Sequence, residues 1–177
     1  MTGPKDPSQF IGSTRDLLAI AYQIEVDAVD RYELLADQMD VCNNTALAEL
    51  FRKLAHIEGL HAKHILEQAG EAGLPALDLL DIEWEGGDSP EALDLTQVHY
   101  MMKPWHAVKL ALAGEQRALE FFEGLKGKFE SEELIALVEE FSEEEREHVE
   151  LMEKELAKYP EPEAGWDDDP DPALYTE

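Results

Sequence analysis

Residues 45–69 read TALAELFRKLAHIEGLHAKHILEQA, and two features of this stretch decide the predicted fold. The apolar residues recur at the spacing of one face of an α-helix, and they are Leu47, Leu50, Phe51, Leu54, Ile57 and Ile65. Glu58 interrupts this apolar face, and His61 follows one helical turn later. An unpaired buried carboxylate is costly. The stretch therefore predicts a core-facing helix whose Glu58 needs a partner.

Three other stretches have the same helical periodicity. Ser13 and Ser131 are suitable N-terminal caps, and Pro104 is suited to a first helical position. We therefore expect four helices, over residues 13–39, 45–69, 104–128 and 131–158.

The connection between the second and third helices is residues 74–103, which is too long for a tight turn. A helix of about 25 residues is roughly 37 Å long, and about thirty extended residues can cover that distance. The predicted fold is therefore all-α: a four-helix bundle of two helical hairpins joined by one long crossover.

Composition divides the chain further and excludes several classes of partner. The sequence has 41 acidic and 14 basic residues and a net charge of −27, so nucleic acids and anionic membranes are unfavourable partners. The bundle domain is expected over residues 13–158, after an N-terminal extension (1–12) and before an acidic, proline-rich tail (159–177). We expect that tail to be solvated, although its Trp166 could dock on a neighbouring molecule.

Cysteine content and hydropathy bear on the cellular compartment. Cys42 is the single cysteine, which excludes an internal disulfide and paired-cysteine metal sites. The first ten residues lack the apolar region of a secretory leader, and no stretch of 18 apolar residues occurs. We expect a soluble, cytoplasmic protein.

Each predicted helix places one glutamate on its apolar face: Glu25, Glu58, Glu115 and Glu145. The second and fourth helices add a histidine three residues later, His61 and His148, on the same helix face. Glu58 follows Glu25 by 33 residues, and Glu145 follows Glu115 by 30 residues, which is a weak internal duplication.

These six residues form a chemically consistent set of metal ligands. Four carboxylates carry a formal charge of −4 when the imidazoles are neutral, which two divalent ions offset. Mixed oxygen and nitrogen ligands suit iron or manganese. The alternative is a metal-free bundle, in which a shift of the helical phase by one residue turns some of these glutamates toward solvent.

The pattern of Glu25, then Glu58 with His61, then Glu115, then Glu145 with His148 resembles the ferritin-like superfamily, and its rubrerythrin branch in particular. The segment ALAGEQRALEFFE around Glu115 also resembles the third helix of rubrerythrins. The resemblance covers roughly residues 13–158 and implies a ferritin-like bundle with a di-iron centre.

The resemblance also implies roles for these residues. Glu58 and Glu145 would bridge two iron ions, Glu25 and Glu115 would be terminal ligands, and His61 and His148 would bind one ion each. Manganese or zinc could replace iron. Tyr32 would donate a hydrogen bond or quench a radical, although a purely structural core tyrosine remains an alternative.

Two features depart from the usual rubrerythrin pattern. Ala118 stands three residues after Glu115, where rubrerythrins often have another glutamate, and this weighs against a specialised peroxide reductase. The paired cysteines of a rubredoxin domain are also missing. Reducing electrons would therefore come from an external donor protein or from ferrous iron itself.

Four functions remain open at this point. The first is reduction of hydrogen peroxide or dioxygen, and the second is iron oxidation and handling or storage. A metal-free structural bundle and oxygenation of an organic substrate are the other two. We also expect a homodimer, because outward-facing leucine and tryptophan residues usually find partners.

Overall fold

The computed structural model describes residues 7–76, 84 and 89–168. Over these residues it has no β-strand, and its main elements are four long helices. They are α1 (Thr14–Val41), α2 (Thr45–Ala69), α3 (Pro104–Leu125) and α4 (Glu132–Leu156). Short 3-10 turns are η1 (Pro7–Phe10), η2 (Gly70–Ala72) and η4 (Leu95–Gln97). The predicted all-α four-helix bundle is confirmed.

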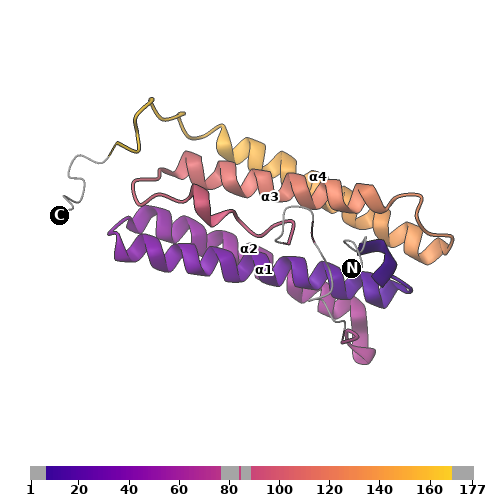
Figure 1. Ribbon diagram of the computed structural model, residues 1–177. Helices are drawn as coiled ribbons and strands as arrows, with labels where there is room; N and C mark the ends of the chain where they lie inside the picture. Colours follow the sequence, from indigo (N-terminus) through magenta and orange to yellow (C-terminus); the bar gives the residue numbers. More distant parts are fainter. Residues whose placement is uncertain (1–6, 77–83, 85–88, 169–177) are drawn as a thin grey trace, which may run out of the picture.

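The helices pair as two hairpins, α1 with α2 and α3 with α4. Figure 1 shows the described end of the crossover running along the bundle between these hairpins, so that α2 and α3 point in the same direction. The predicted N-terminal extension (1–12), crossover (74–103) and tail (159–177) each lie partly outside the described residues.

Local sequence signals set most helix ends. The Ser13 hydroxyl accepts a hydrogen bond from the Asp16 backbone N–H at 3.3 Å, and Ser131 caps α4 in the same way. Pro104 is the first residue of α3. That helix ends three residues before the predicted Lys128. The chain turns at Gly127, whose φ of 76° lies in the left-handed region that glycine tolerates.

A layer of carboxylates separates two apolar clusters in the core. In α1, Glu25 lies between Ile24 of one cluster and Ala28 of the other. The other helices repeat this arrangement: Glu58 lies between Ala55 and Ile65, and Glu115 lies between Ala111 and Phe122. The polar layer is therefore enclosed by apolar side chains at both ends of the bundle.

Part of the C-terminal tail packs on its own chain. The Trp166 ring contacts the ring of His106, with centroids 3.7 Å apart, and lies edge-on to His99 at 5.6 Å. Trp166 also packs against one of the two core clusters. Trp166 therefore docks on its own bundle, while most of the other described tail residues are exposed.

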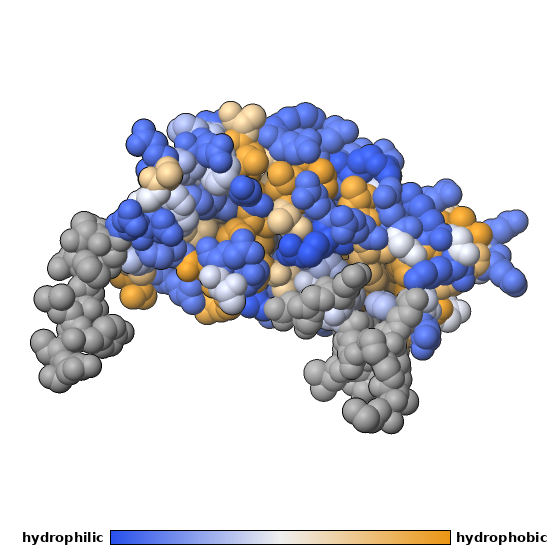
Figure 2. Space-filling view, turned by 45° about the horizontal axis from the view of Figure 1, so that its top comes forward, coloured by the Kyte–Doolittle hydropathy of each residue, from blue (hydrophilic) through white to orange (hydrophobic). Residues whose placement is uncertain are grey.

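The face of the molecule seen in Figure 2 carries both hydrophilic and hydrophobic residues, and the hydrophobic residues are visible between the polar ones. Exposed apolar side chains include Leu34, Leu60 and Leu151. Among the described residues, none of the helices combines the length and the apolar character that crossing a membrane requires.

Candidate metal centre

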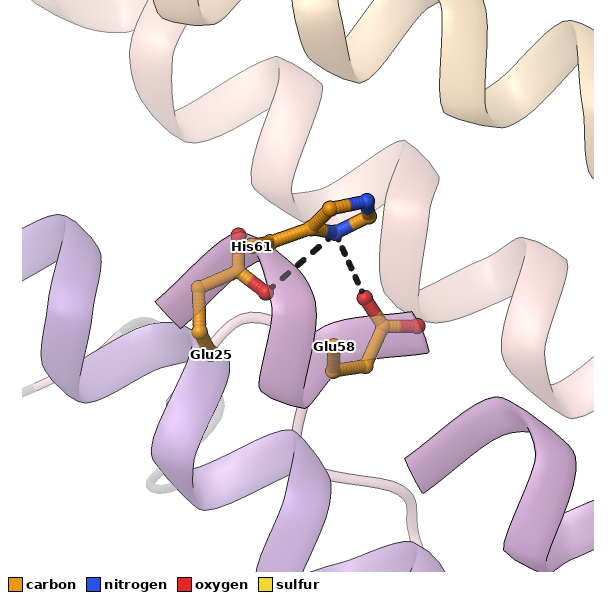
Figure 3. Close-up of side chains that lie close together, drawn as sticks. All are labelled: Glu25, Glu58 and His61. Carbon is orange, nitrogen blue, oxygen red and sulfur yellow. Dashed lines mark hydrogen bonds and ion pairs between the residues drawn. The ribbon is translucent and has the colours of Figure 1, made fainter. Parts of the chain in front are cut away.

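The first hairpin brings one imidazole and two carboxylates together. Glu25 comes from α1, and Glu58 and His61 come from α2 (Figure 3). The His61 Nδ1 atom lies 3.0 Å from Glu58 Oε2 and 3.7 Å from Glu25 Oε2. Both glutamates are buried, while His61 is only partly so.

The second hairpin repeats this arrangement. Glu115 comes from α3, and Glu145 and His148 come from α4. The His148 Nδ1 atom lies 3.5 Å from Glu115 Oε2 and 3.4 Å from Glu145 Oε2. In each group of three residues, one potential ligand atom per residue lies within 4.8 Å of the other two.

The two groups meet at their histidines. The rings of His61 and His148 stack with centroids 4.3 Å apart and an interplanar angle of 10°. The structure thus brings all six predicted ligand residues into one layer of the bundle, as two similar halves.

Whether these six residues fit a pair of metal ions can be judged from their buried carboxylate oxygens that form no hydrogen bond. The Oε2 atoms of Glu25, Glu115 and Glu145 are buried and form no hydrogen bond, although each lies 3.4–3.7 Å from a histidine Nδ1. Buried polar atoms are normally satisfied. Two groups of carboxylate oxygens around an imidazole nitrogen are the donors that iron or manganese accepts. The residues therefore fit such a pair.

Burial also changes the protonation of the carboxylates. Burial raises the pKa of Glu25 to about 8, and neighbouring Glu58 and Glu145 add to the shift. Burial likewise raises the pKa of Glu115 and of Glu145. Burial thus shifts all three carboxyl groups toward their neutral form, and a nearby cation opposes that shift.

The pKa values of the two histidines are raised, which favours their charged, protonated form. Burial works to lower the pKa of His61, but the carboxylates of Glu25 and Glu58 outweigh it and raise the pKa to about 10. For His148, burial is likewise outweighed by Glu115 and Glu145, and the pKa rises to about 11. A proton on each imidazole thus occupies the place that a metal cation would take.

Tyr32 lies next to this layer, in the core cluster that also contains Phe51. Burial raises its pKa well above 10, and the charges of Glu58 and Glu115 add to the shift. Its phenol therefore stays protonated. The two other histidines of α2, His56 and His64, are exposed and outside the six-residue layer.

A fifth carboxylate was missed by sequence reasoning. Glu91 comes from the crossover, is buried, and approaches Glu25 and Glu145 so that one carboxylate oxygen from each lies within 4.8 Å of the others. Burial raises its pKa well above the ordinary value. No helical period marks this residue. It is one of seven acidic residues in the crossover, so the sequence did not distinguish it from the others.

Comparison with known proteins agrees with this site. The Rubrerythrin family model matches residues 16–83. A crystal structure at 2.00 Å of an uncharacterized conserved protein from Magnetospirillum magnetotacticum MS-1 is 32% identical. It aligns with a TM-score of 0.62 over 85% of this chain and 98% of the other. The chain belongs to the rubrerythrin family. No curated protein matches it significantly.

Membership in the rubrerythrin family confirms the resemblance seen in the sequence and indicates a ferritin-like protein of the di-iron kind. The carboxylate and histidine groups described above are the residues that could hold metal in this family member.

Proposed function

We propose that this rubrerythrin-family protein binds two iron ions in the carboxylate and histidine layer and uses them to reduce hydrogen peroxide or dioxygen. The observation that carries the proposal is the pair of matched groups, each with two glutamates and one histidine, joined by the His61–His148 stack. When bound, a ferrous pair supplies the two electrons that, with two protons, reduce one hydrogen peroxide to two water molecules.

Glu58 and Glu145 are proposed as the bridging ligands. The charge of Glu58 raises the pKa of Glu25 in its own group and of Glu115 in the other group. Glu145 likewise acts on Glu25, across the two groups, and is itself affected by Glu115. Each of these two glutamates therefore interacts with carboxylates of both halves, as a bridging ligand would, and Glu25 and Glu115 do so as well. The choice of Glu58 and Glu145 as the bridges follows the rubrerythrin resemblance.

Glu25 and Glu115 would then be terminal ligands, and His61 and His148 would each bind one ion through Nδ1, the atom that faces the carboxylates. The two apolar clusters on either side shield the buried glutamates from bulk water, while the layer is open to solvent at the partly exposed His61. Tyr32 keeps its proton and can donate a hydrogen bond toward the site.

Iron oxidation and handling is a second candidate, which the charge of −27 favours because it attracts ferrous ions. Manganese or zinc could occupy the same ligands. The external electron donor, the homodimer and the cytoplasmic location remain predictions.

Anaerobic loading with ferrous iron, followed by separate addition of peroxide and oxygen, tests the proposal. Rapid oxidation of about two irons per chain by peroxide, with the iron retained and available for renewed reduction, supports a peroxidase. Faster oxidation by dioxygen, with more than two irons processed per chain, supports iron handling instead. A ferrous protein that reacts with neither oxidant contradicts both.

A further inference from the structure

We propose that Glu91, which comes from the crossover rather than from a helix of the bundle, is a seventh protein ligand of the metal pair. This inference rests on the proposed function, because it requires metal ions in the layer formed by the helices. It adds a residue that the helical pattern does not contain.

The carboxylate of Glu91 is buried where a cation would bind. Its side chain is 4% exposed, and its Oε1 atom has no hydrogen-bond partner. One of its oxygens lies within 4.8 Å of an oxygen of Glu25 and of an oxygen of Glu145, and these two glutamates belong to different halves of the site. Glu91 therefore reaches the place where the two halves meet.

The backbone around Glu91 is held close to α3. A Cβ atom at Gly114 would lie 3.4 Å from the Glu91 carbonyl oxygen and 3.5 Å from its Cα. These are van der Waals distances, so the crossover backbone lies directly against α3 at Gly114. Since Gly114 directly precedes Glu115, this close approach brings Glu91 to the level of the metal ligands.

Arg117 fixes the same segment on both sides of Glu91. Its Nε donates a hydrogen bond to the Pro90 carbonyl at 2.8 Å, and a terminal nitrogen donates to the Ala92 carbonyl at 3.3 Å. These bonds are to the backbone, so they leave the Glu91 carboxylate free to face the layer. Arg117 thus acts as a positioning residue.

A purely structural role does not explain this arrangement. A structural carboxylate would have its oxygens hydrogen-bonded, and a fifth buried acid among four others is unfavourable without cations. With Glu91 ionised, the five carboxylates carry −5, which two divalent ions reduce to −1 and two trivalent ions turn to +1. A cation pair at the layer accounts for both the burial and the unpartnered oxygen.

The test is anaerobic titration of the full chain with cobalt(II), comparing wild type, Glu91→Gln and the control Glu120→Gln. Glu120 lies on α3 but is exposed. Binding is followed by calorimetry, and coordination by the visible absorption of cobalt, which strengthens as the coordination number falls. We expect about two ions per chain in all three proteins. Glu91→Gln should weaken at least one site by on the order of 10-fold and change the spectrum, while Glu120→Gln changes neither.

The outcomes separate this inference from the proposed function. If wild type binds no cobalt, the proposed metal site of the helical layer is contradicted. If wild type binds two ions and Glu91→Gln keeps the same affinity and spectrum, the metal site is supported and the role of Glu91 as a ligand is contradicted. A lower thermal midpoint of the metal-free Glu91→Gln protein, with unchanged cobalt affinity, would point to a structural role and also contradict it.

Arg117→Met gives an independent variant should Glu91→Gln fail to fold. It keeps the carboxylate but removes the hydrogen bonds to residues 90 and 92. Weaker cobalt binding, with the wild-type spectrum at saturation, supports the inference. Wild-type affinity in Arg117→Met contradicts it.

Discussion

The imidazole rings of His61 and His148 stack at 4.3 Å across the junction of the two helical hairpins. Each ring turns its Nδ1 atom to two carboxylates of its own hairpin. In the metal-free protein, two protonated imidazoles would repel each other in this position, and cations bound at Nδ1 would take the place of the protons. The stack therefore links the protonation of the site to its metal content.

The first prediction concerns the stability of the metal-free protein against pH. The pKa values of Glu25, His61 and His148 are raised on folding, so the native state binds more protons than the unfolded state. The free energy of unfolding should then fall as pH rises, by about 1.4 kcal/mol per pH unit for each extra proton. For Glu25 this loss spans the interval from its ordinary value of 4.5 to about 8.

Urea unfolding of the metal-free protein between pH 5.5 and 8 measures this slope. The net charge of −27 also lowers the stability of the fold as pH rises. A variant that lacks the Glu25 carboxyl group therefore separates the contribution of Glu25 from this general charge repulsion. Glu25→Gln should flatten the slope, whereas Glu49→Gln, on the exposed side of α2, should leave it unchanged. Stability that is constant or rises with pH in wild type would refute the assignment.

The second prediction concerns metal binding itself. Since metal ions replace protons on the ligands, binding should release protons and raise the thermal midpoint. Calorimetric titration with manganese(II) in two buffers of different ionisation enthalpy counts the protons released. Binding without proton release, or with an unchanged thermal midpoint, would argue against this site.

The third prediction concerns Tyr32. If its phenol donates a hydrogen bond to the reacting oxygen species, Tyr32→Phe should slow oxidation of the ferrous protein by peroxide by on the order of 10-fold or more. Its metal stoichiometry should not change. Tyr22→Phe, at a half-buried position beside the other core cluster, is the matched control. Equal rates in both variants would assign Tyr32 a packing role alone.

The fourth prediction concerns the docked tail. Trp166→Ala removes the ring that contacts His106 and His99. The free energy of unfolding should fall by roughly 1–3 kcal/mol, because a partly buried aromatic ring loses its contacts. Metal stoichiometry should stay at the wild-type value. Denaturant unfolding checks this, and unchanged stability would show that the tail contact contributes nothing.

The sequence predicted the four helices because their signals are local. Apolar spacing, the serine caps at Ser13 and Ser131, and Pro104 act within a few residues and need no tertiary information. The six helical ligand candidates were found for the same reason, since each glutamate interrupts an apolar face at a fixed spacing.

Glu91 and Trp166 could not be placed in this way. Both lie in irregular segments, where no period shows which side chains face inward. Their positions depend on contacts far along the chain, between Glu91 and Gly114 and between Trp166 and His106. Such contacts follow from the packed bundle and not from local propensity.

The metal content of the purified protein after anaerobic iron loading decides whether the carboxylate and histidine layer holds two iron ions. Wild type and the Glu49→Gln control should each hold about two irons per chain, and the Glu58→Ala/Glu145→Ala double variant should hold none while circular dichroism shows that it remains helical. Wild-type protein that binds no iron, or a folded double variant that retains two irons per chain, would contradict the account.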